Sequence, residues 1–413
     1  MPPFPGGAAD EAVTVLIAGA GPAGSALAWH LAKAGVQVHV VDRARFPREK
    51  PCSEYMSPET VRLLDRIGVV SALERSGAIA LRGTSVIGAG GAQLTGLFAN
   101  LPTPPFRDTG LSVARRVLDA ELVAAARAAG AQVHEGVAAV GVLEEAGRIR
   151  GLRLRLEDGQ SVDVAARVTV GADGLRSIVA RRTARVRHRF PSRLGFVAHV
   201  AGVSGLTDRA EMHVGPDGYA GLNPISAGIA NVALVVPSRL AAGQAKGRAG
   251  DFFFERLERL PGVRGRFRRE AVVREVLVTG PFASEARPVI RDGALLVGDA
   301  ADFFDPFTGE GIYRALLGAE FAAAAIIPAL EAPGPITAAS LQGYAEARRR
   351  AFSGTWSVER LIGYGMLWPG LFNRAVRLLG TRPGMADTLI GVTGDCLPAR
   401  SVLNPYFLAR MIV

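Results

Sequence analysis

The chain has 413 residues, of which 49% are hydrophobic and 21% charged, and this balance excludes a disordered or low-complexity protein. Its two cysteines, Cys52 and Cys396, exclude a disulfide framework or a four-cysteine metal site and fit a reducing, cytoplasmic compartment. The net charge of +10 comes almost entirely from scattered arginines, which favours a solvated surface, with peripheral contact to an acidic membrane as the second interpretation and nucleic acid as the least favoured.

Two further features of the sequence concern targeting and membranes. Residues 1–12 contain Asp10 and Glu11 and no basic stretch before an apolar core, so we expect no secretory signal there. The longest apolar run, residues 321–330, is too short to span a bilayer. We therefore expect residues 316–330 to form a core helix.

Residues 13–42 carry a dinucleotide-binding pattern. Residues 13–18 are a continuous apolar run of the kind expected for a buried parallel strand. A glycine turn follows at 19–24, then a predicted helix over 22–34 and a predicted strand over 37–42 that ends in an acid. Glycines also occur in ordinary turns, but the order strand, glycine turn, helix, strand and acid is the full fingerprint. We conclude that a dinucleotide binds here.

Each part of this fingerprint has a physical reason. Gly19 permits the tight turn, Gly21 lets a pyrophosphate approach the backbone, and Gly24 lets the helix pack close to the strand. The start of the helix offers free N–H groups and a positive partial charge, and Asp42 is placed to accept hydrogen bonds from an adenosine ribose. The predicted cofactor-binding residues in this part of the chain are Gly19, Gly21, Pro22, Ala23, Gly24, Asp42 and Arg43.

Three further motifs decide which dinucleotide is bound. They are residues 113–119, which precede a predicted helix at 120–129, residues 168–177, and residues 294–312. Together with the glycine fingerprint, their order and spacing resemble the FAD-dependent family that contains aromatic-ring hydroxylases of the p-hydroxybenzoate hydroxylase type and geranylgeranyl reductases. The resemblance covers residues 13–345 and implies FAD as the cofactor.

The resemblance also implies roles for single residues. Arg115 should lie along the FAD pyrophosphate or adenosine, and Asp173 should help to hold FAD and the nicotinamide cofactor. Asp299 should bind ribityl or ribose hydroxyls. The remaining implied residues are Gly298, Pro306 near the flavin ring, and Gly309, Gly311 and Ile312, which open a helix aimed at the pyrimidine edge. A helix N-terminus there would stabilise the negative charge of reduced flavin by roughly 0.3–2 kcal/mol.

The fold class implied by the resemblance is α/β: a Rossmann-like FAD-binding domain of the glutathione-reductase type, an inserted and mainly antiparallel β-sheet domain for substrate, and a helical C-terminal segment. The predicted boundaries are 1–80, 110–185 and 282–345 for the FAD domain, 81–109 and 186–281 for the sheet domain, and 346–413 for the helices. The sequence contains no second glycine fingerprint, so NAD(P)H, if it is the reductant, should visit a shared groove transiently.

The segment 43–58, with Lys50 and Cys52, is similar to the lysine–cysteine segment of geranylgeranyl reductases, which passes close to flavin and substrate. Ser53 and Glu54 stand where that family has glycines. Cys52 is a candidate proton donor or a wall of the pocket, although a lone cysteine is more often a small buried hydrophobe. Tyr55 is a second candidate donor.

Other candidate substrate residues lie in the predicted sheet. Tyr219 and Pro224 are what remains of the reductases' Tyr-x-Trp-x-Phe-Pro segment, and no tryptophan pair of the halogenase kind stands there. His199 and His213 can each deprotonate a phenol, because the ordinary pKa of histidine is about 6.5. More often, however, a histidine in such a position is simply a polar residue on the outer face of the sheet. The sequence predicts no metal site.

Three hypotheses of function follow. The first, which the altered Tyr219–Pro224 segment favours, is an NAD(P)H-dependent monooxygenase that uses molecular oxygen on a hydrophobic aromatic or polyketide-like small molecule. The second is a reductase of isolated double bonds in an isoprenoid chain. The third is a flavin-binding or electron-carrying protein with no substrate of its own.

Overall fold

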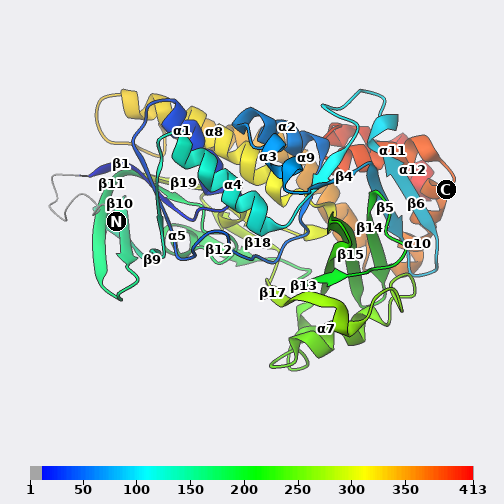
Figure 1. Ribbon diagram of the computed structural model, residues 1–413. Helices are drawn as coiled ribbons and strands as arrows, with labels where there is room; N and C mark the ends of the chain where they lie inside the picture. Colours follow the sequence, from blue (N-terminus) through cyan, green and yellow to red (C-terminus); the bar gives the residue numbers. More distant parts are fainter. Residues whose placement is uncertain (1–11, 413) are drawn as a thin grey trace.

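A mostly parallel sheet forms one end of the molecule in the computed structural model, which describes residues 12–412 (Figure 1). Its strand order is β19-β20-β11-β1-β2-β8, in which only β19 runs antiparallel to its neighbour. The strands are β1 (Val13–Ala18), β2 (Val38–Asp42), β8 (Gln132–Glu135), β11 (Ser161–Gly171), β19 (Ile290–Arg291) and β20 (Ala294–Leu296), with the hairpin strands β9 (Ala138–Glu145) and β10 (Arg148–Arg155) attached to β11. The expected dinucleotide-binding α/β fold is confirmed.

Helices α1 (Pro22–Lys33), α4 (Arg115–Ala128) and α8 (Gly311–Glu331) lie together along this sheet (Figure 1). The sequence places the second of these helices at 120–129, which is wrong at its start. Helix α4 begins at Arg115 because the Glu54 carboxylate accepts the free Arg115 N–H at 2.8 Å. This cap comes from a residue far away in the chain, so no local pattern reveals it.

The second sheet lies at the other end of the molecule (Figure 1). Its order is β17-β13-β16-β15-β14-β5-β6, and every pair is antiparallel except β14 with β5. The strands are β5 (Gly83–Ile87), β6 (Gln93–Leu97), β13 (Arg193–Ala201), β14 (Arg209–Gly215), β15 (Gly218–Ser226), β16 (Ile229–Pro237) and β17 (Val272–Thr279). One face packs on α7 (Ala249–Leu257), and the other shares a core with the C-terminal helices.

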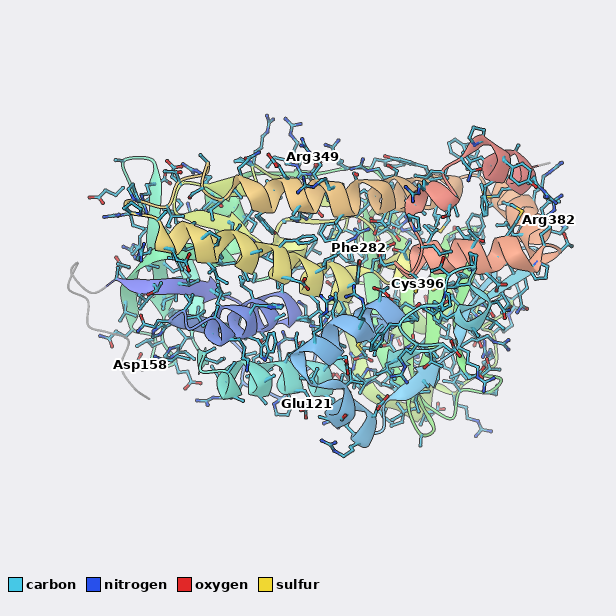
Figure 2. All side chains as sticks on the ribbon, turned by 90° about the horizontal axis from the view of Figure 1, so that it is seen from above. Glu121, Asp158, Phe282, Arg349, Arg382 and Cys396 are labelled. Atoms are coloured by element: carbon cyan, nitrogen blue, oxygen red, sulfur yellow. The ribbon has the colours of Figure 1, made fainter. Side chains whose placement is uncertain are left out.

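The C-terminal helices are α9 (Gln342–Gly365), α10 (Pro369–Gly380), α11 (Pro383–Thr393) and α12 (Pro405–Ile412). Pro369 and Pro383, which the sequence marks as breaks, each occupy the first position of a new helix, where a missing N–H costs nothing. Figure 2 shows α8 and α9 running side by side, and the two helices are in contact.

Helix α8 is long and apolar enough to cross a membrane by composition alone. In the molecule 56% of its most apolar window is buried, because α8 packs on α1, α2 (Pro58–Ile67) and α9. It is a core helix, as expected from the sequence.

Shorter elements complete the chain. They are the strands β3 (Tyr55–Met56), β4 (Ile79–Leu81), β7 (Gly110–Ser112), β12 (Arg185–His188), β18 (Ser284–Arg287) and β21 (Asp302–Phe303), the helices α3 (Val70–Arg75), α5 (Ile178–Thr183) and α6 (Ser238–Ala241), and the single 3-10 turns η1 (Phe98–Asn100), η2 (Arg269–Ala271), η3 (Gly298–Ala300), η4 (Pro306–Thr308) and η5 (Ala399–Ser401).

Candidate functional site

The glycine turn between β1 and α1 is closed as the fingerprint requires. Gly19 has φ +99°, a backbone conformation that residues with a side chain rarely adopt. A methyl group on Gly24 would lie 1.8 Å from the Gly19 carbonyl oxygen. Asp42 fixes the turn, because its two carboxylate oxygens accept the N–H groups of Ala20 and Ala44 at 2.8 and 2.9 Å. Asp42 therefore has a structural role besides the predicted one toward the ribose, which stays a prediction.

A large cavity opens at this turn and runs between the two sheets. Its empty space, which includes open solvent at the mouth, is about 1210 Å³. Of the residues predicted to bind the cofactor, those that line it are Gly21, Pro22, Ala23, Arg115, Asp299, Pro306, Gly309, Gly311 and Ile312. We call this the first cavity.

Cationic side chains gather at the glycine-turn end of the first cavity. Arg115 donates two hydrogen bonds of 2.8 Å to Asp119, and Arg48 lies 2.9 Å from the same carboxylate. Burial alone would lower the pKa of the Arg115 guanidinium, but Asp119 and Cys52 together outweigh burial, so the pKa is raised. A methyl group on Gly21 would lie 3.6 Å from Arg48 Nη2. Two held guanidiniums beside free backbone N–H groups fit the two charges of a pyrophosphate.

The middle of the first cavity holds Asp299, in the 3-10 turn that follows β20. Burial raises the pKa of this carboxyl, while Lys50 and Arg115 oppose the shift. Burial likewise lowers the pKa of Lys50, aided by Arg115 and opposed by Asp299. Asp299 lines the first cavity, where its carboxylate could accept hydrogen bonds from the hydroxyls of a ribityl chain.

Replacing Asp299 with alanine should weaken FAD retention by about 1–3 kcal/mol, because buried flavin hydroxyls would lose their acceptor. The measurement is FAD content after gel filtration, with dissociation constants from flavin fluorescence. Asp292→Ala, which removes an exposed carboxylate outside the cavity, is the matched control. Full FAD content in Asp299→Ala protein would contradict the assignment.

The other predicted cofactor residues lie near the first cavity without lining it. Asp173 accepts the Ile178 N–H at 2.6 Å and so caps α5, and its second oxygen is buried without a partner among the described residues. Burial raises its pKa. Gly298 packs on Ala23, and Arg43 is exposed beyond β2. The roles of these residues toward FAD stay predictions. Among them, Asp173 has an acceptor oxygen without a partner among the described residues.

A second cavity adjoins the first at the end marked by Pro306 and Gly309. Its empty space is about 670 Å³. The two cavities share the lining residues Ser53, Met212, Gly221, Ala233, Pro306 and Gly309. The second sheet forms one wall, and Ile362 of α9 with Leu389, Ile390 and Thr393 of α11 forms the other. The exposed surface of this cavity is mainly apolar, although Glu211, Asn223 and Asn231 are among the lining residues, and such a surface suits a hydrophobic substrate.

The two candidate proton donors lie in different cavities. Cys52 lines the first, where it contacts Arg115 and accepts the Glu54 N–H at 3.4 Å. Tyr55 lines the second, with its hydroxyl beside the Thr84 hydroxyl. Its ring packs on Gly309, where an added methyl group would lie 2.6 Å from Tyr55 Cδ1. Burial, aided by Cys396, raises the pKa of Tyr55 and keeps the phenol protonated.

The candidate substrate residues of the sheet are mostly engaged elsewhere. The Tyr219 ring lines the first cavity, but its hydroxyl donates to Asp305 at 2.6 Å. Pro224 lines neither cavity. His213 lies 2.8 Å from Glu211, and His199 lies 2.7 Å from Glu54 in a separate groove. Neither histidine lines the two cavities, and each imidazole is held by a carboxylate, of which Glu211 itself lines the second cavity.

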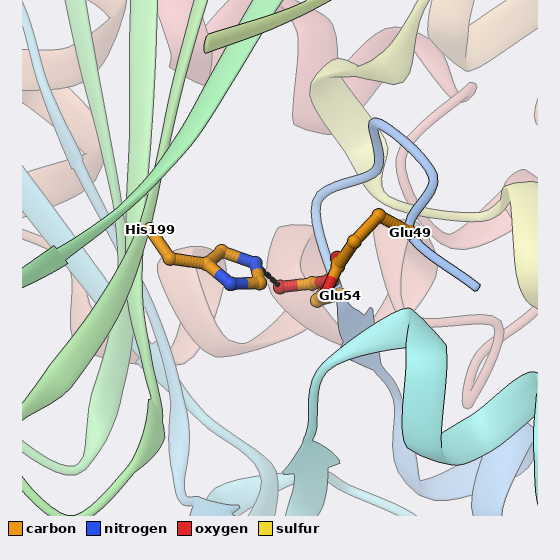
Figure 3. Close-up of side chains that lie close together, drawn as sticks. All are labelled: Glu49, Glu54 and His199. Carbon is orange, nitrogen blue, oxygen red and sulfur yellow. Dashed lines mark hydrogen bonds and ion pairs between the residues drawn. The ribbon is translucent and has the colours of Figure 1, made fainter. Parts of the chain in front are cut away.

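Glu54 stands where the resembled family has a glycine, and its contacts show what the side chain does in this chain. Its φ is +59°, in the region that favours glycine, and its buried carboxylate joins His199 to the start of α4 (Figure 3). Glu49 lies beside this pair, so three ligand-type groups meet. Arg274 is 3.4 Å from Glu49 and already supplies positive charge. We assign no metal to this group.

A set of buried carboxyl groups surrounds Arg314 at the start of α8. Arg314 donates to Glu310 and, at 2.9 Å, to Glu359 of α9. Burial raises the pKa values of Glu310 and Asp395, and it raises that of Glu359 to about 8, against the influence of Arg314. Ionising all three carboxyl groups around one guanidinium would cost free energy, so some of the three stay protonated near neutral pH.

This cluster makes stability depend on pH. The native Glu359 binds a proton up to pH about 8, whereas the unfolded chain releases it near 4.5, so its contribution to stability is complete below pH 4.5 and is lost as pH rises to 8. We expect Glu359→Gln to gain melting temperature relative to the unchanged protein across that range. Glu346→Gln, on the same helix and partly exposed, is the control. A constant difference between pH 5 and 8 would refute the assignment.

Sequence reasoning missed several residues of the site. Arg48 and the C-terminal residues of the second cavity carry no local signal, since they reach the site only through tertiary packing. Asp119 could have been found, because it stands four residues after Arg115, the spacing of a helical ion pair.

Comparison with known proteins agrees with this geometry. The profile of the FAD binding domain family matches residues 12–353. The menaquinone reductase of Mycobacterium tuberculosis is 32% identical over 315 residues, which are 73% of this chain and 74% of that protein. The digeranylgeranylglycerophospholipid reductase of Methanosarcina acetivorans is 27% identical over 350 residues, which are 82% of this chain and 81% of that protein.

A solved structure matches in fold. A geranylgeranyl bacteriochlorophyll reductase-like protein of Thermoplasma acidophilum superposes with a TM-score of 0.78 at 21% identity, over 96% of this chain and 97% of that one. At this identity the likeness shows the fold alone.

Proposed function

Because the chain belongs to the FAD binding domain family and is an FAD-dependent oxidoreductase, we propose that it reduces isolated carbon–carbon double bonds in an isoprenoid chain of a lipid. Two relatives that cover most of the chain are named reductases, one of menaquinone and one of digeranylgeranylglycerophospholipid. A geranylgeranyl group is an unsaturated isoprenoid. These names support the reductase over the monooxygenase that the sequence alone favours, which stays a prediction.

The observation that carries the proposal is the junction of the two cavities. The FAD motifs line the first, and the second is apolar, closed by helices and reached past Pro306 and Gly309. An isoprenoid chain in the second cavity would lie against whatever ring occupies the junction. The second cavity also holds one buried, protonated phenol, Tyr55.

The reaction needs a hydride and a proton for each double bond. FAD held along the first cavity by residues such as Arg115 and Asp299 would, when reduced, supply the hydride with its two electrons, so that one carbon–hydrogen bond forms as the π bond breaks. We assign the proton to Tyr55, whose O–H bond breaks as the second carbon–hydrogen bond forms. Solvent then returns a proton to the phenolate. Thr84 positions the hydroxyl.

The electrons must come from outside the chain. We propose NAD(P)H as a transient reductant, since the sequence has one glycine fingerprint and the first cavity is open at its mouth. Asp173, with its unused buried oxygen beside the cavity, is the residue proposed to serve both cofactors.

The deciding experiment is anaerobic. The FAD-loaded protein is reduced with dithionite, mixed with a digeranylgeranyl glycerolipid, which has no quinone ring to accept the electrons, and the lipid is analysed by mass spectrometry. The proposal requires re-oxidation of the flavin with a mass gain of two hydrogens per turnover. Flavin that stays reduced until oxygen enters, with a gain of one oxygen in a product, would establish a monooxygenase instead. Flavin cycling with no altered lipid would leave an electron carrier.

A further inference from the structure

Large apolar side chains are exposed where α9 ends and α10 begins. Trp368 is 61% exposed and Phe190, from the chain before β13, is also 61% exposed. The whole set, which we call the α9–α10 patch, consists of Phe190, Leu361, Tyr364, Leu367, Trp368 and Leu371. Monomeric soluble proteins rarely expose so many large apolar groups together, and such patches mark interaction surfaces.

The patch spans the junction of α9 and α10. Leu361 and Tyr364 lie one turn apart near the end of α9 at Gly365, and Trp368 precedes the first residue of α10, which carries Leu371 in its first turn. The Tyr364 hydroxyl donates to the Phe190 carbonyl at 3.1 Å, which fixes Phe190 beside the helix. Residues next to the patch in the sequence point inward. The patch is therefore the outer face of these helices.

The inner face of the same helices forms the second cavity. Ile362, next to Leu361, lines that cavity. Phe372, next to Leu371, contacts the ring of Phe307, another lining residue, with the centroids 6.5 Å apart. One layer of side chains thus separates the patch from the cavity.

The residues after 346 expose positive charge and little negative charge, although Glu285 and Asp302 of earlier segments lie beside Arg360 in one small pocket. After residue 346 the sequence contains three acids, Glu359, Asp387 and Asp395, and the first two are only 4% and 5% exposed. Asp395 belongs to the buried cluster at Arg314. Arginines are exposed beside the patch, among them Arg360 and Arg377, and Figure 2 shows Arg349 of α9 pointing away from the ribbon. The surface of these helices is therefore apolar and cationic.

We propose that the α9–α10 patch docks on an anionic lipid bilayer. Tryptophan and tyrosine beside aliphatic side chains suit the headgroup level of a bilayer, where one end is apolar and the other wet. Arginines snorkel to the phosphates from the same depth and are attracted by anionic lipid. A protein surface would need acidic partners and a matching shape, whereas a bilayer needs only this composition. The docking does not depend on the proposed reaction.

Vesicle co-sedimentation tests the proposal with the FAD-loaded, full-length protein. Vesicles are made of phosphatidylcholine alone or mixed with phosphatidylglycerol. We expect the unchanged protein to sediment with the mixed vesicles and much less with phosphatidylcholine. The double variant Trp368→Glu with Leu371→Glu should bind roughly tenfold less or weaker still, since two apolar anchors are lost and two negative charges are added. Arg360→Gln and Arg377→Gln should each lower binding about fivefold.

Phe106→Glu is the matched control, because Phe106 is 48% exposed outside the patch. Circular dichroism and FAD content establish that each variant is folded. The proposal is overturned if the unchanged protein stays in the supernatant, or if Phe106→Glu loses as much binding as the double variant. It is also overturned if light scattering shows a dimer that the double variant splits, because a second copy would then cover the patch. Normal vesicle binding by a protein that forms no lipid product would contradict the proposed reaction and leave the docking proposal standing.

Discussion

Tyr55→Phe should lower the rate of double-bond reduction roughly 100- to 10,000-fold, the usual contribution of a positioned general acid. The change removes one oxygen and keeps the ring on Gly309, so the shapes of both cavities should survive. Flavin reduction by dithionite or NAD(P)H should be unaffected, because the phenol lies in the second cavity. Stopped-flow absorbance separates the two half-reactions, and product is counted by mass spectrometry.

Tyr313→Phe is the matched control for this variant. Tyr313 is also a tyrosine whose pKa is raised by burial, but it lines neither cavity. Because the pKa of Tyr55 is raised, we expect its contribution to the rate to be flat from acid to neutral pH. If Tyr55→Phe keeps the rate and Cys52→Ser loses it, the proton comes from the first cavity and the assignment to Tyr55 is wrong.

The FAD motifs could be predicted from the sequence because their physics is local. The turn at Gly19, the approach at Gly21 and the close packing at Gly24 are decided by residues within a few positions of each other. The same holds for the core helix α8, where residues 321–330 form an uninterrupted apolar run.

The parts that could not be predicted depend on contacts between distant segments. The Glu54 carboxylate sets the start of α4 and holds His199, yet in the sequence it reads only as a missing glycine. The second cavity is closed by α9 and α11, whose sequences carry only a general apolar pattern. Periodicity says which residues face inward but not which surface they meet, so the substrate site needed the structure.

Gly21→Val should weaken FAD binding by about 100-fold or more while leaving the fold intact. A first methyl group on Gly21 would meet only Arg48 Nη2, at 3.6 Å, which is ordinary contact. The branches of valine would enter the first cavity at the turn, where a pyrophosphate has to approach the backbone. The FAD-free variant should therefore melt at the temperature of the FAD-free unchanged protein and lose only the stabilisation that FAD confers.

Gly24→Ala gives the contrast that makes this result specific. Its added methyl group would lie 1.8 Å from the Gly19 carbonyl oxygen, so backbone must move and the FAD-free protein itself should lose stability. Gly343→Ala, on α9 with nothing within 4 Å of the added methyl group, should change neither property. Calorimetry of the FAD-free proteins and flavin fluorescence titration measure both. A Gly21→Val protein that binds FAD as tightly as the unchanged chain would mean that the pyrophosphate lies elsewhere, and the placement of the cofactor along the first cavity would fall with it.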